Sequence, residues 1–460
     1  MRHRDDDEDL VLIRPCGAEE GWFGAFHPKG QWLRATLGSF EAPSPQPGGE
    51  RIDCDLSNGE RASLYGCYSL GWRRRGPNGS SSTNLACAQC IRGADLWPPE
   101  RPVRRARFEL APIAHYFTQT SAAAEIVDAG FDSELTQRKL FATETDELLV
   151  TLALSQTWTA SRRTATDAIP TFEVHYREAA TIDSFLEPLA AISQFFEASC
   201  GEPLQPSRIE ISSLTSDEWA ERAEAKEYVS DHSVDVDLEE VGVGRFARAN
   251  WPIWSILGKE SRENLEASLA VWIARWSEWA DANLLLRQVM AARGELSGER
   301  LLTAARWVES IQTLPMTETF DADISKRLVD LVIGELSAEG ADLPRERIAG
   351  AIHGLRKEPR SAYYLRLVDW CAGPLSAKER TLLAGDVSKA MNRRGGAAHG
   401  RLRITDENYV ETRRQIAALE AVGLLLTTEA LSLGENEIQK LLQHPLVLDY
   451  RLLIRGQKDS

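Results

Sequence analysis

Short runs of aromatic and branched residues, separated by turn residues, dominate the chain up to about residue 215. Residues 21–26 and 32–37 are two such runs, and the Pro-Lys-Gly sequence at 28–30 predicts a hairpin-like connection between them. A helical spacing of apolar residues interrupts this pattern at residues 182–199. Further strands are predicted at residues 64–68, 84–91, 108–110, 148–154, 171–176 and 208–212. The sequence therefore predicts a β-rich N-terminal domain over residues 1–215.

From residue 251 onward, the apolar residues follow the helical period instead. Leu265, Leu269, Trp272, Trp276 and Trp279 fall on one helix face, where we expect them to pack a core rather than to stack bases. Further helices are predicted at residues 282–293, 298–313, 324–339, 345–356, 362–371, 377–391, 408–426 and 436–442. Successive helices with short connectors predict an α-helical bundle.

These patterns together predict an α+β protein of two domains. The helical bundle occupies residues 251–460. Residues 216–250, which are rich in Asp and Glu, are expected to be an acidic connector, either a helix followed by a loop or a linker. A chain of 460 residues is too long for one ordinary core, which agrees with this division.

Composition and charge narrow the function. The sequence is 43% hydrophobic and 27% charged, as in soluble globular proteins, and no apolar run approaches the ~20 residues that cross a bilayer. No signal-peptide core follows the N-terminus, and the seven cysteines have no framework spacing, so we expect a cytoplasmic protein without a membrane partner. A net charge of −16 excludes bulk coating of nucleic acid, so RNA would need a local basic site.

One segment between two predicted helices supplies such a site. It gathers arginines around His399, and they are Arg393, Arg394, Arg401 and Arg403. Cleaving an RNA phosphodiester without a metal requires a proton transfer and stabilisation of the charge on phosphorus. Histidine suits the proton transfer, and the planar guanidinium of arginine suits the phosphate.

The spacing of Arg394 and His399 raises a geometric objection. Positions five apart lie about 140° from each other around a regular helix. We expect Gly395 and Gly396 to permit a bend or a helix start between them, or a partner chain to complete the site. The alternative is that the segment is a solvated loop in which His399 is a capping or core residue.

The chain resembles the HEPN superfamily, in which R-x4-H followed by glycine lies late in a helical domain. Arg394, His399 and Gly400 match these positions. More specifically, the chain resembles the ApeA-like branch of bacterial anti-phage, abortive-infection proteins, which join a β-rich N-terminal domain to a C-terminal HEPN domain. Besides the R-x4-H run, the likeness rests on the aromatic-glycine opening and on residues 86–93, 107–116, 305–313 and 433–442.

This resemblance implies a metal-independent endoribonuclease that needs no cofactor. It implies a homodimer, or a higher oligomer, that cuts RNA, with tRNA as one candidate, after a phage-derived trigger. Arg394 would hold the scissile phosphate and His399 would act as acid or base. The glycine pair departs from the family pattern, which more often has a polar residue there, so either the site is built on a looser backbone or the activity has been lost.

Five further charged and polar positions complete the expected site. Arg393, Arg401 and Arg403 are expected to bind RNA, and Arg393 is a second candidate for the phosphate role. Asn392 and Glu309 are expected to lie behind the catalytic pair and to support it.

Two other features allow competing interpretations. Cys87 and Cys90, with Cys54 and Cys67 upstream, resemble zinc ligands in spacing. Because residues 84–91 look like one strand, however, side chains three apart would point to opposite faces, and we expect structural thiols and no metal.

The arginines at 73–75 and at 104, 105 and 107 form basic clusters on the β-rich domain. They are expected to be solvated loop and strand edges, and the competing hypothesis is an RNA or phage-component contact.

A function of another class also fits the sequence. In it, the helical domain is a non-catalytic dimerisation or nucleotide-binding module, and the β-rich domain recognises a ligand or a protein. RNA cutting that disappears when His399 is replaced would distinguish the enzyme from this module.

Overall fold

The computed structural model divides the chain into two compact units, which are described separately. The first contains Met1–Glu197, Pro203–Trp251 and Ser255–Ala274, and the second contains Ala198–Glu202, Pro252–Trp254 and Arg275–Ser460. The described residues are 11–15, 22–27, 33–39, 51–56, 59–74, 81–118, 137–158, 165–225, 233–238, 252–254, 259–311, 314–341, 343–400, 402–429 and 431–456. The predicted fold class, a β-rich region followed by an all-helical one, is confirmed.

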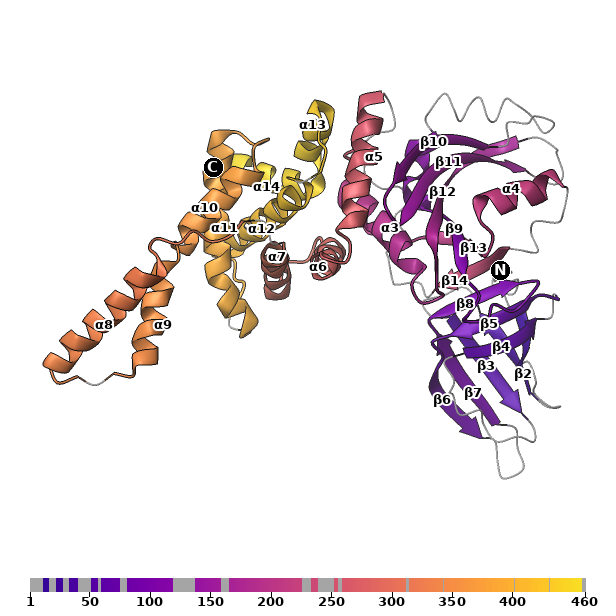
Figure 1. Ribbon diagram of the computed structural model, residues 1–460, viewed down its shortest axis with the longest axis horizontal. Helices are drawn as coiled ribbons and strands as arrows, with labels where there is room; N and C mark the ends of the chain where they lie inside the picture. Colours follow the sequence, from indigo (N-terminus) through magenta and orange to yellow (C-terminus); the bar gives the residue numbers. More distant parts are fainter. Residues whose placement is uncertain are drawn as a thin grey trace. The chain divides into compact units, whose positions relative to one another are not determined.

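Within these described residues, the first unit is built on one antiparallel sheet of fourteen strands (Figure 1). The strands are β1 (Val11–Pro15), β2 (Trp22–His27), β3 (Leu33–Ser39), β4 (Arg51–Leu56), β5 (Arg61–Tyr65), β6 (Tyr68–Arg74), β7 (Ser81–Cys87), β8 (Gln89–Gly93), β9 (Val103–Glu109), β10 (Gln137–Glu144), β11 (Leu148–Trp158), β12 (Ala165–Ala180), β13 (Ser207–Ser212) and β14 (Ser233–Leu238). Their order across the sheet is β10-β11-β12-β9-β13-β14-β8-β5-β4-β1-β2-β3-β7-β6.

Two of the predicted strands are interrupted. Gly66, just after β5, has a φ of 61°, in the left-handed region that favours glycine, and a Cβ there would lie 2.9 Å from that of Ala88. Ala88 separates β7 from β8, and its N–H donates to the Tyr65 carbonyl at 3.0 Å. The predictions of continuous strands at 64–68 and 84–91 are therefore wrong, because these two positions form the breaks.

The stretch expected to be an acidic connector carries regular structure. The helix α4 (Ser216–Glu224) opens it, and β14 then pairs with β13 on one side and with β8 on the other. Val236 of β14 is buried, whereas the strand also carries acidic residues. Val234, Val236 and Leu238 alternate with polar residues along β14, which is the period of a strand with one apolar face.

Aromatic packing joins the sheet to the helix α3 (Leu186–Cys200), which confirms the helix predicted at residues 182–199. Phe108 of β9 stacks on Phe172 of β12 with ring centroids 5.2 Å apart, and Phe196 of α3 lies 5.4 Å from Phe172. All three rings are buried, and each contributes about 1.5–3 kcal/mol relative to an exposed side chain. The short helices η1 (Ala111–Ile113) and α1 (Ala114–Thr118) complete this region.

The tryptophan-bearing face predicted as one helix is divided between the two units. The helix α5 (Lys259–Ala274) ends before the last two tryptophans, and its Trp272 is buried in the first unit. Glu266 of α5 accepts hydrogen bonds from Ala142 N (3.3 Å) and Thr143 Oγ1 (2.8 Å) of β10. Trp279 is buried in the second unit, so the predicted core role of both tryptophans is confirmed.

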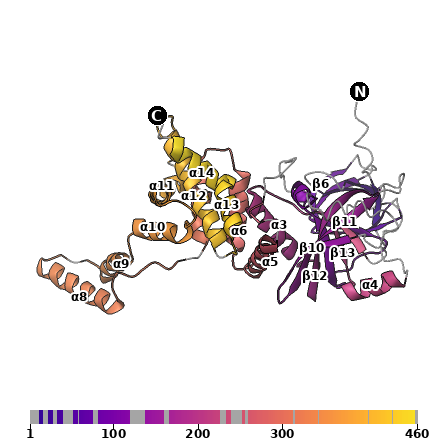
Figure 2. The ribbon, with the colours of Figure 1, turned by 90° about the horizontal axis from the view of Figure 1, so that it is seen from above.

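The second unit is helical throughout its described part. Its helices are α6 (Ala280–Ala291), α7 (Gly298–Ser310), α8 (Ala322–Ala338), α9 (Arg345–Arg356), α10 (Arg360–Cys371), α11 (Ala377–Ala398), α12 (Tyr409–Glu429), α13 (Glu435–Gln443) and α14 (Pro445–Arg455). α12 is buried along nearly its whole length, as its apolar residues on every face predict. In both views α8 and α9 form a hairpin that extends away from the other helices (Figure 2).

Buried ion pairs fix the register of the helices that carry the candidate site. Arg300 of α7 forms a bidentate pair with Glu420 of α12, at 2.7 and 2.8 Å, and Glu420 is only 1% exposed. Asp386 of α11 accepts from Arg414 Nε of α12 at 3.1 Å and from the Tyr450 hydroxyl of α14 at 3.1 Å. Because a buried charge without its partner is costly, these contacts tie α7, α11, α12 and α14 together.

Candidate functional site

The helix α11 carries the predicted catalytic segment at its C-terminal end. It continues through Gly395 and Gly396 to Ala398, and His399 is its C-cap, with its N–H bonded to the Gly395 carbonyl at 3.3 Å. Gly400 then ends the helix with a φ of 63°. The predicted bend or helix start at the glycine pair is therefore wrong.

A continuous helix places the two candidate catalytic side chains on different faces. Arg394 and His399 remain about 140° apart around the axis of α11. The His399 side chain is exposed and, among the described residues, forms no hydrogen bond or ion pair. One chain thus offers an exposed histidine at the helix end and an arginine that points elsewhere.

Arg394 points toward α7. Its guanidinium Nη1 forms a charge-assisted hydrogen bond with Glu309 Oε1, and both side chains are more than one-third exposed, at 39% and 37%. A partly exposed ion pair contributes about 0–1 kcal/mol to stability. The pair therefore orients Arg394 without burying its side chain.

Arg393 points toward α12 instead. Its guanidinium donates to Glu411 Oε2 (2.8 Å), Gln415 Oε1 (3.1 Å) and Thr412 Oγ1 (3.4 Å). Three acceptors on one helix leave little of this guanidinium for a phosphate. Arg393 therefore fixes α11 on α12 through three acceptors, whereas Arg394 has a single acceptor, Glu309.

The remaining predicted residues lie at the surface around the helix end. Asn392 and Arg403 are exposed, and the Arg403 carbonyl accepts from Asn408 Nδ2 at 2.9 Å. Arg401 lies outside the described residues. The Leu402 N–H donates to the Gly396 carbonyl at 3.2 Å, which folds the chain back along the end of α11.

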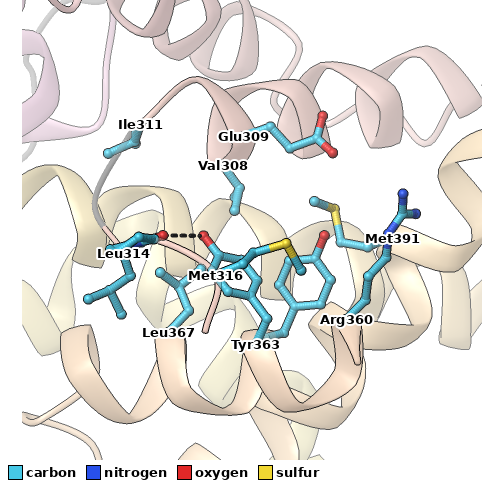
Figure 3. Close-up of a pocket in the computed structure, with 11 residues that line it drawn as sticks. Val308, Glu309, Ile311, Leu314, Met316, Arg360, Tyr363, Leu367 and Met391 are labelled. Carbon is cyan, nitrogen blue, oxygen red and sulfur yellow. Dashed lines mark hydrogen bonds between the residues drawn. The ribbon is translucent and has the colours of Figure 1, made fainter. Parts of the chain in front are cut away.

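A pocket of about 610 Å³ lies beside the Arg394–Glu309 pair, between α7 and α10 (Figure 3). Glu309 and Arg360 reach one end of it, and Leu314 stands at the other. Tyr363 and Tyr364 form part of its wall. Our sequence interpretation missed this pocket.

The sequence did contain one signal for it. Arg360, Tyr363, Tyr364 and Leu367 have the i, i+3, i+4, i+7 spacing that puts side chains on one helix face. A helix face that only packs a core rarely carries an arginine and two tyrosines beside a leucine. The residues of α7 that complete the pocket are too distant in sequence to be inferred.

Charged groups at one end of the pocket change the pKa of the Tyr364 hydroxyl. Burial raises the pKa of the Tyr364 hydroxyl, and the Glu309 carboxylate raises it further. Arg360 and Arg394 act in the opposite direction on the same pKa, which places both cations near this ring. The pocket and the Arg394–Glu309 pair therefore form one electrostatic environment.

Comparison with known proteins covers the first unit. Residues 26–239 match the family described as ApeA N-terminal domain 1, a span that includes β3 to β14. The chain is an ApeA-like protein. This membership supports a role in anti-phage defence, and no curated protein and no solved structure matches the chain. None of the helices in the described part of this ApeA-like protein combines the length and apolarity needed to cross a membrane.

The structure brings Cys54, Cys67, Cys87 and Cys90 of the β-rich unit into one cluster, and Cys16 lies outside the described residues. Cys54, Cys87 and Cys90 are buried with partly buried Cys67 beside them, and the Sγ atoms of Cys67 and Cys87 are 3.3 Å apart. The expectation that Cys87 and Cys90 point to opposite faces is wrong, because Ala88 separates them into two strands. Even so, no group of three or more His, Cys, Asp or Glu side chains among the described residues could hold a metal ion.

The basic cluster on β9 of the ApeA-like domain is used internally. Arg105 is 8% exposed, pairs with Glu173 at 2.8 Å and stacks on Trp219 with its Cζ 4.6 Å from the ring centroid. Arg107 pairs with the same carboxylate at 2.9 Å. Burial raises the pKa of Glu173, but hydrogen bonds from His175 and Arg105 outweigh it and lower the pKa to about 2.

The expectation of a solvated strand edge is therefore wrong for these two arginines, because β9 pairs with β12 and β13 and both guanidinium groups pair with Glu173. An RNA contact by this cluster stays a prediction. The side chains of the other basic cluster, at 73–75, lie outside the described residues.

Proposed function

We propose that this ApeA-like protein is a metal-independent HEPN-type endoribonuclease that acts in anti-phage defence by abortive infection. The observation that carries the proposal is the end of α11, where a half-exposed Arg394 is oriented by Glu309 and an exposed His399 has no partner among the described residues. Both groups are accessible, and they are the residue types that RNA cleavage without a metal requires.

The chemistry follows from these two groups. The ribose 2′-oxygen attacks the adjacent phosphorus, the bond from phosphorus to the 5′-oxygen breaks, and the products are a 2′,3′-cyclic phosphate and a 5′-hydroxyl. Arg394 neutralises the charge that develops on the phosphoryl oxygens. The 2′-oxygen loses a proton and the leaving 5′-oxygen gains one. His399 carries out one of these two transfers, and a solvent water molecule, which is regenerated, carries out the other. No oxidant, metal or water is consumed in this step.

The helical geometry favours a site made by two chains. Because Arg394 and His399 lie about 140° apart on a regular helix, one chain does not direct both at the same phosphate. In a homodimer with two-fold symmetry, Arg394 of one protomer and His399 of its partner are able to meet across the axis, and the symmetry then makes two such sites.

The test is to identify RNA ends in infected cells, since the natural trigger is supplied there. Cells expressing the full-length protein, or its His399→Ala or Arg394→Ala variant, are infected with phage, and new 2′,3′-cyclic phosphate and 5′-hydroxyl ends are mapped. His353→Ala is the matched control, because His353 is an exposed histidine on α9. We expect new ends, in tRNA or other RNA, with the wild type and the control.

We expect no new ends with either site variant. Cutting that persists at the wild-type level in His399→Ala would refute the assignment. Purified wild-type protein should also cut RNA in EDTA once it is activated, because no step uses a metal.

A further inference from the structure

The pocket beside Arg394 is a preformed cavity, and no role has been assigned to it above. Its volume of about 610 Å³ lies within the ~300–1,000 Å³ range of small-molecule sites. Three hydrogen bonds join residues 314–317, of which 314–316 form one wall of the pocket, to α10 and to Glu358. Tyr363 donates to the Leu314 carbonyl at 3.3 Å, Arg366 donates to the Pro315 carbonyl at 2.7 Å, and Thr317 N donates to Glu358 at 2.7 Å.

The lining combines flat apolar surface with charge at one end. Tyr363, Tyr364 and Met316 provide aromatic and polarisable surface, which suits the face of a planar ring. Arg360 is exposed at the charged end and forms no ion pair with any described residue. Figure 3 shows its guanidinium directed to the same end as the Glu309 carboxylate.

Two connections join the pocket to the phosphate ligand. Glu309 lines the pocket and also binds Arg394, so an occupant at this end contacts the carboxylate that orients the guanidinium. Met391 lines the pocket from α11 and lies three residues before Arg394, on the same side of that helix. A ligand that fills the pocket is therefore adjacent to the anion that Arg394 binds.

We infer that this pocket binds one unstacked base of the RNA, that of the nucleotide whose phosphate Arg394 holds. The inference rests on the proposed ribonuclease function and specifies how its substrate is held. The base stacks on the tyrosine wall, Glu309 accepts a hydrogen bond from an N–H group on the base edge, and Arg360 contacts a neighbouring phosphate. Single-stranded RNA is commonly held in this way, by splayed bases on aromatic side chains.

The experiment measures binding separately from cleavage. The probe is a fluorescein-labelled hexanucleotide with 2′-O-methyl groups, which the protein is unable to cut because its 2′-oxygens carry no proton. A probe of the same length with abasic positions reports the backbone alone. Fluorescence anisotropy with the full-length protein gives Kd for both probes.

Base recognition predicts that the probe with bases binds about 5-fold or more tightly than the abasic probe. Tyr363→Ala should remove most of that difference, whereas Tyr363→Phe, which keeps the ring, should retain it. Arg360→Gln should weaken both probes, since it contacts phosphate. Its matched control is Arg347→Gln, on an exposed α9 arginine that lies outside the pocket and forms no ion pair among the described residues, and this variant should bind as the wild type does.

Equal affinity for the two probes, or a base preference that Tyr363→Ala leaves unchanged, would overturn the inference. Failure of the two proposals can be told apart. His399-dependent RNA cutting in infected cells, combined with no base preference, removes the pocket inference alone. A base preference lost in Tyr363→Ala, combined with no RNA cutting by the wild type, supports the pocket and removes the proposed ribonuclease. Free nucleotides that bind while the hexanucleotide does not would identify a mononucleotide ligand, and would contradict RNA as the occupant.

Discussion

The packing of α7 on α12 depends on a glycine. A Cβ added at Gly423 would lie 2.5 Å from Trp307 Cε3 and 2.6 Å from Cζ3, and Trp307 is only 1% exposed. Carbon atoms pack best at about 3.5–4.0 Å, so the methyl group of Gly423→Ala would intrude by about 1 Å. The indole has little freedom to move aside, because the Arg300–Glu420 pair fixes α7 on α12.

The effect of Gly423→Ala on the free energy of unfolding is the difference between two opposing contributions. Replacing glycine by alanine inside a helix contributes about 1 kcal/mol in favour of folding. Overpacking a buried site costs about 1–3 kcal/mol, and the rigid, bulky neighbour puts Gly423→Ala at the upper end. We therefore expect a loss of about 2 kcal/mol in the free energy of unfolding, seen as a drop of about 4–8 °C in Tm.

Thermal unfolding followed by circular dichroism at the helical band measures this loss. The control is Gly385→Ala on α11, an exposed helical glycine with no atom within 4 Å of the added methyl group, and it should raise Tm slightly. In a Trp307→Phe background, the cost of Gly423→Ala should shrink, since the clashing ring atoms are removed. If Gly423→Ala were as stabilising as Gly385→Ala, the packing account would be refuted.

Three further predictions concern ion pairing, pH and the candidate site. Arg300→Leu leaves Glu420 buried without its partner and should lower the free energy of unfolding by about 3–5 kcal/mol in urea titrations. A loss below about 1 kcal/mol would mean that water reaches and solvates the Glu420 carboxylate. Burial, reinforced by Arg293, lowers the pKa of His444 from 6.5 to about 3, so the unfolded chain binds more protons between these values. Stability should therefore fall as pH drops below 6.5, by about 1.4 kcal/mol per unit, and His444→Gln should flatten that slope. In the double variant Gly395→Ala, Gly396→Ala, each added methyl group has no atom within 4 Å, so the variant should raise Tm and retain RNA cutting. Lost cutting would show that α11 must unwind there.

Most helices could be predicted because each carries its own apolar face. The end of α11 could not, because two glycines suggest a break. Tertiary contacts overrule that local preference. Arg393 is held by three acceptors on α12, and Asp386 is held by Arg414 and by the Tyr450 hydroxyl, so the helix is fixed along its length.

The sheet and the pocket depend on contacts between distant residues, which one sequence does not reveal. β14 lies between β13 and β8, and the turn at Gly66 is matched to Ala88 across the sheet. Likewise, Glu309 of α7 and Arg360 of α10 line one pocket only because both helices pack against α11. The candidate arginine and histidine could be named from their chemistry, but their separation around α11 required the structure.

The most direct test of the central claim is complementation between two inactive variants. Arg394→Ala and His399→Ala are expressed separately and together in phage-infected cells, and RNA ends with 2′,3′-cyclic phosphate are counted. If the site joins Arg394 of one protomer to His399 of its partner, each variant alone should cut no RNA. A mixed dimer then regains one intact site of its two, and random pairing should restore about one quarter of wild-type cutting. Co-expression that restores no cutting, although the wild type cuts, would contradict a site shared between two chains.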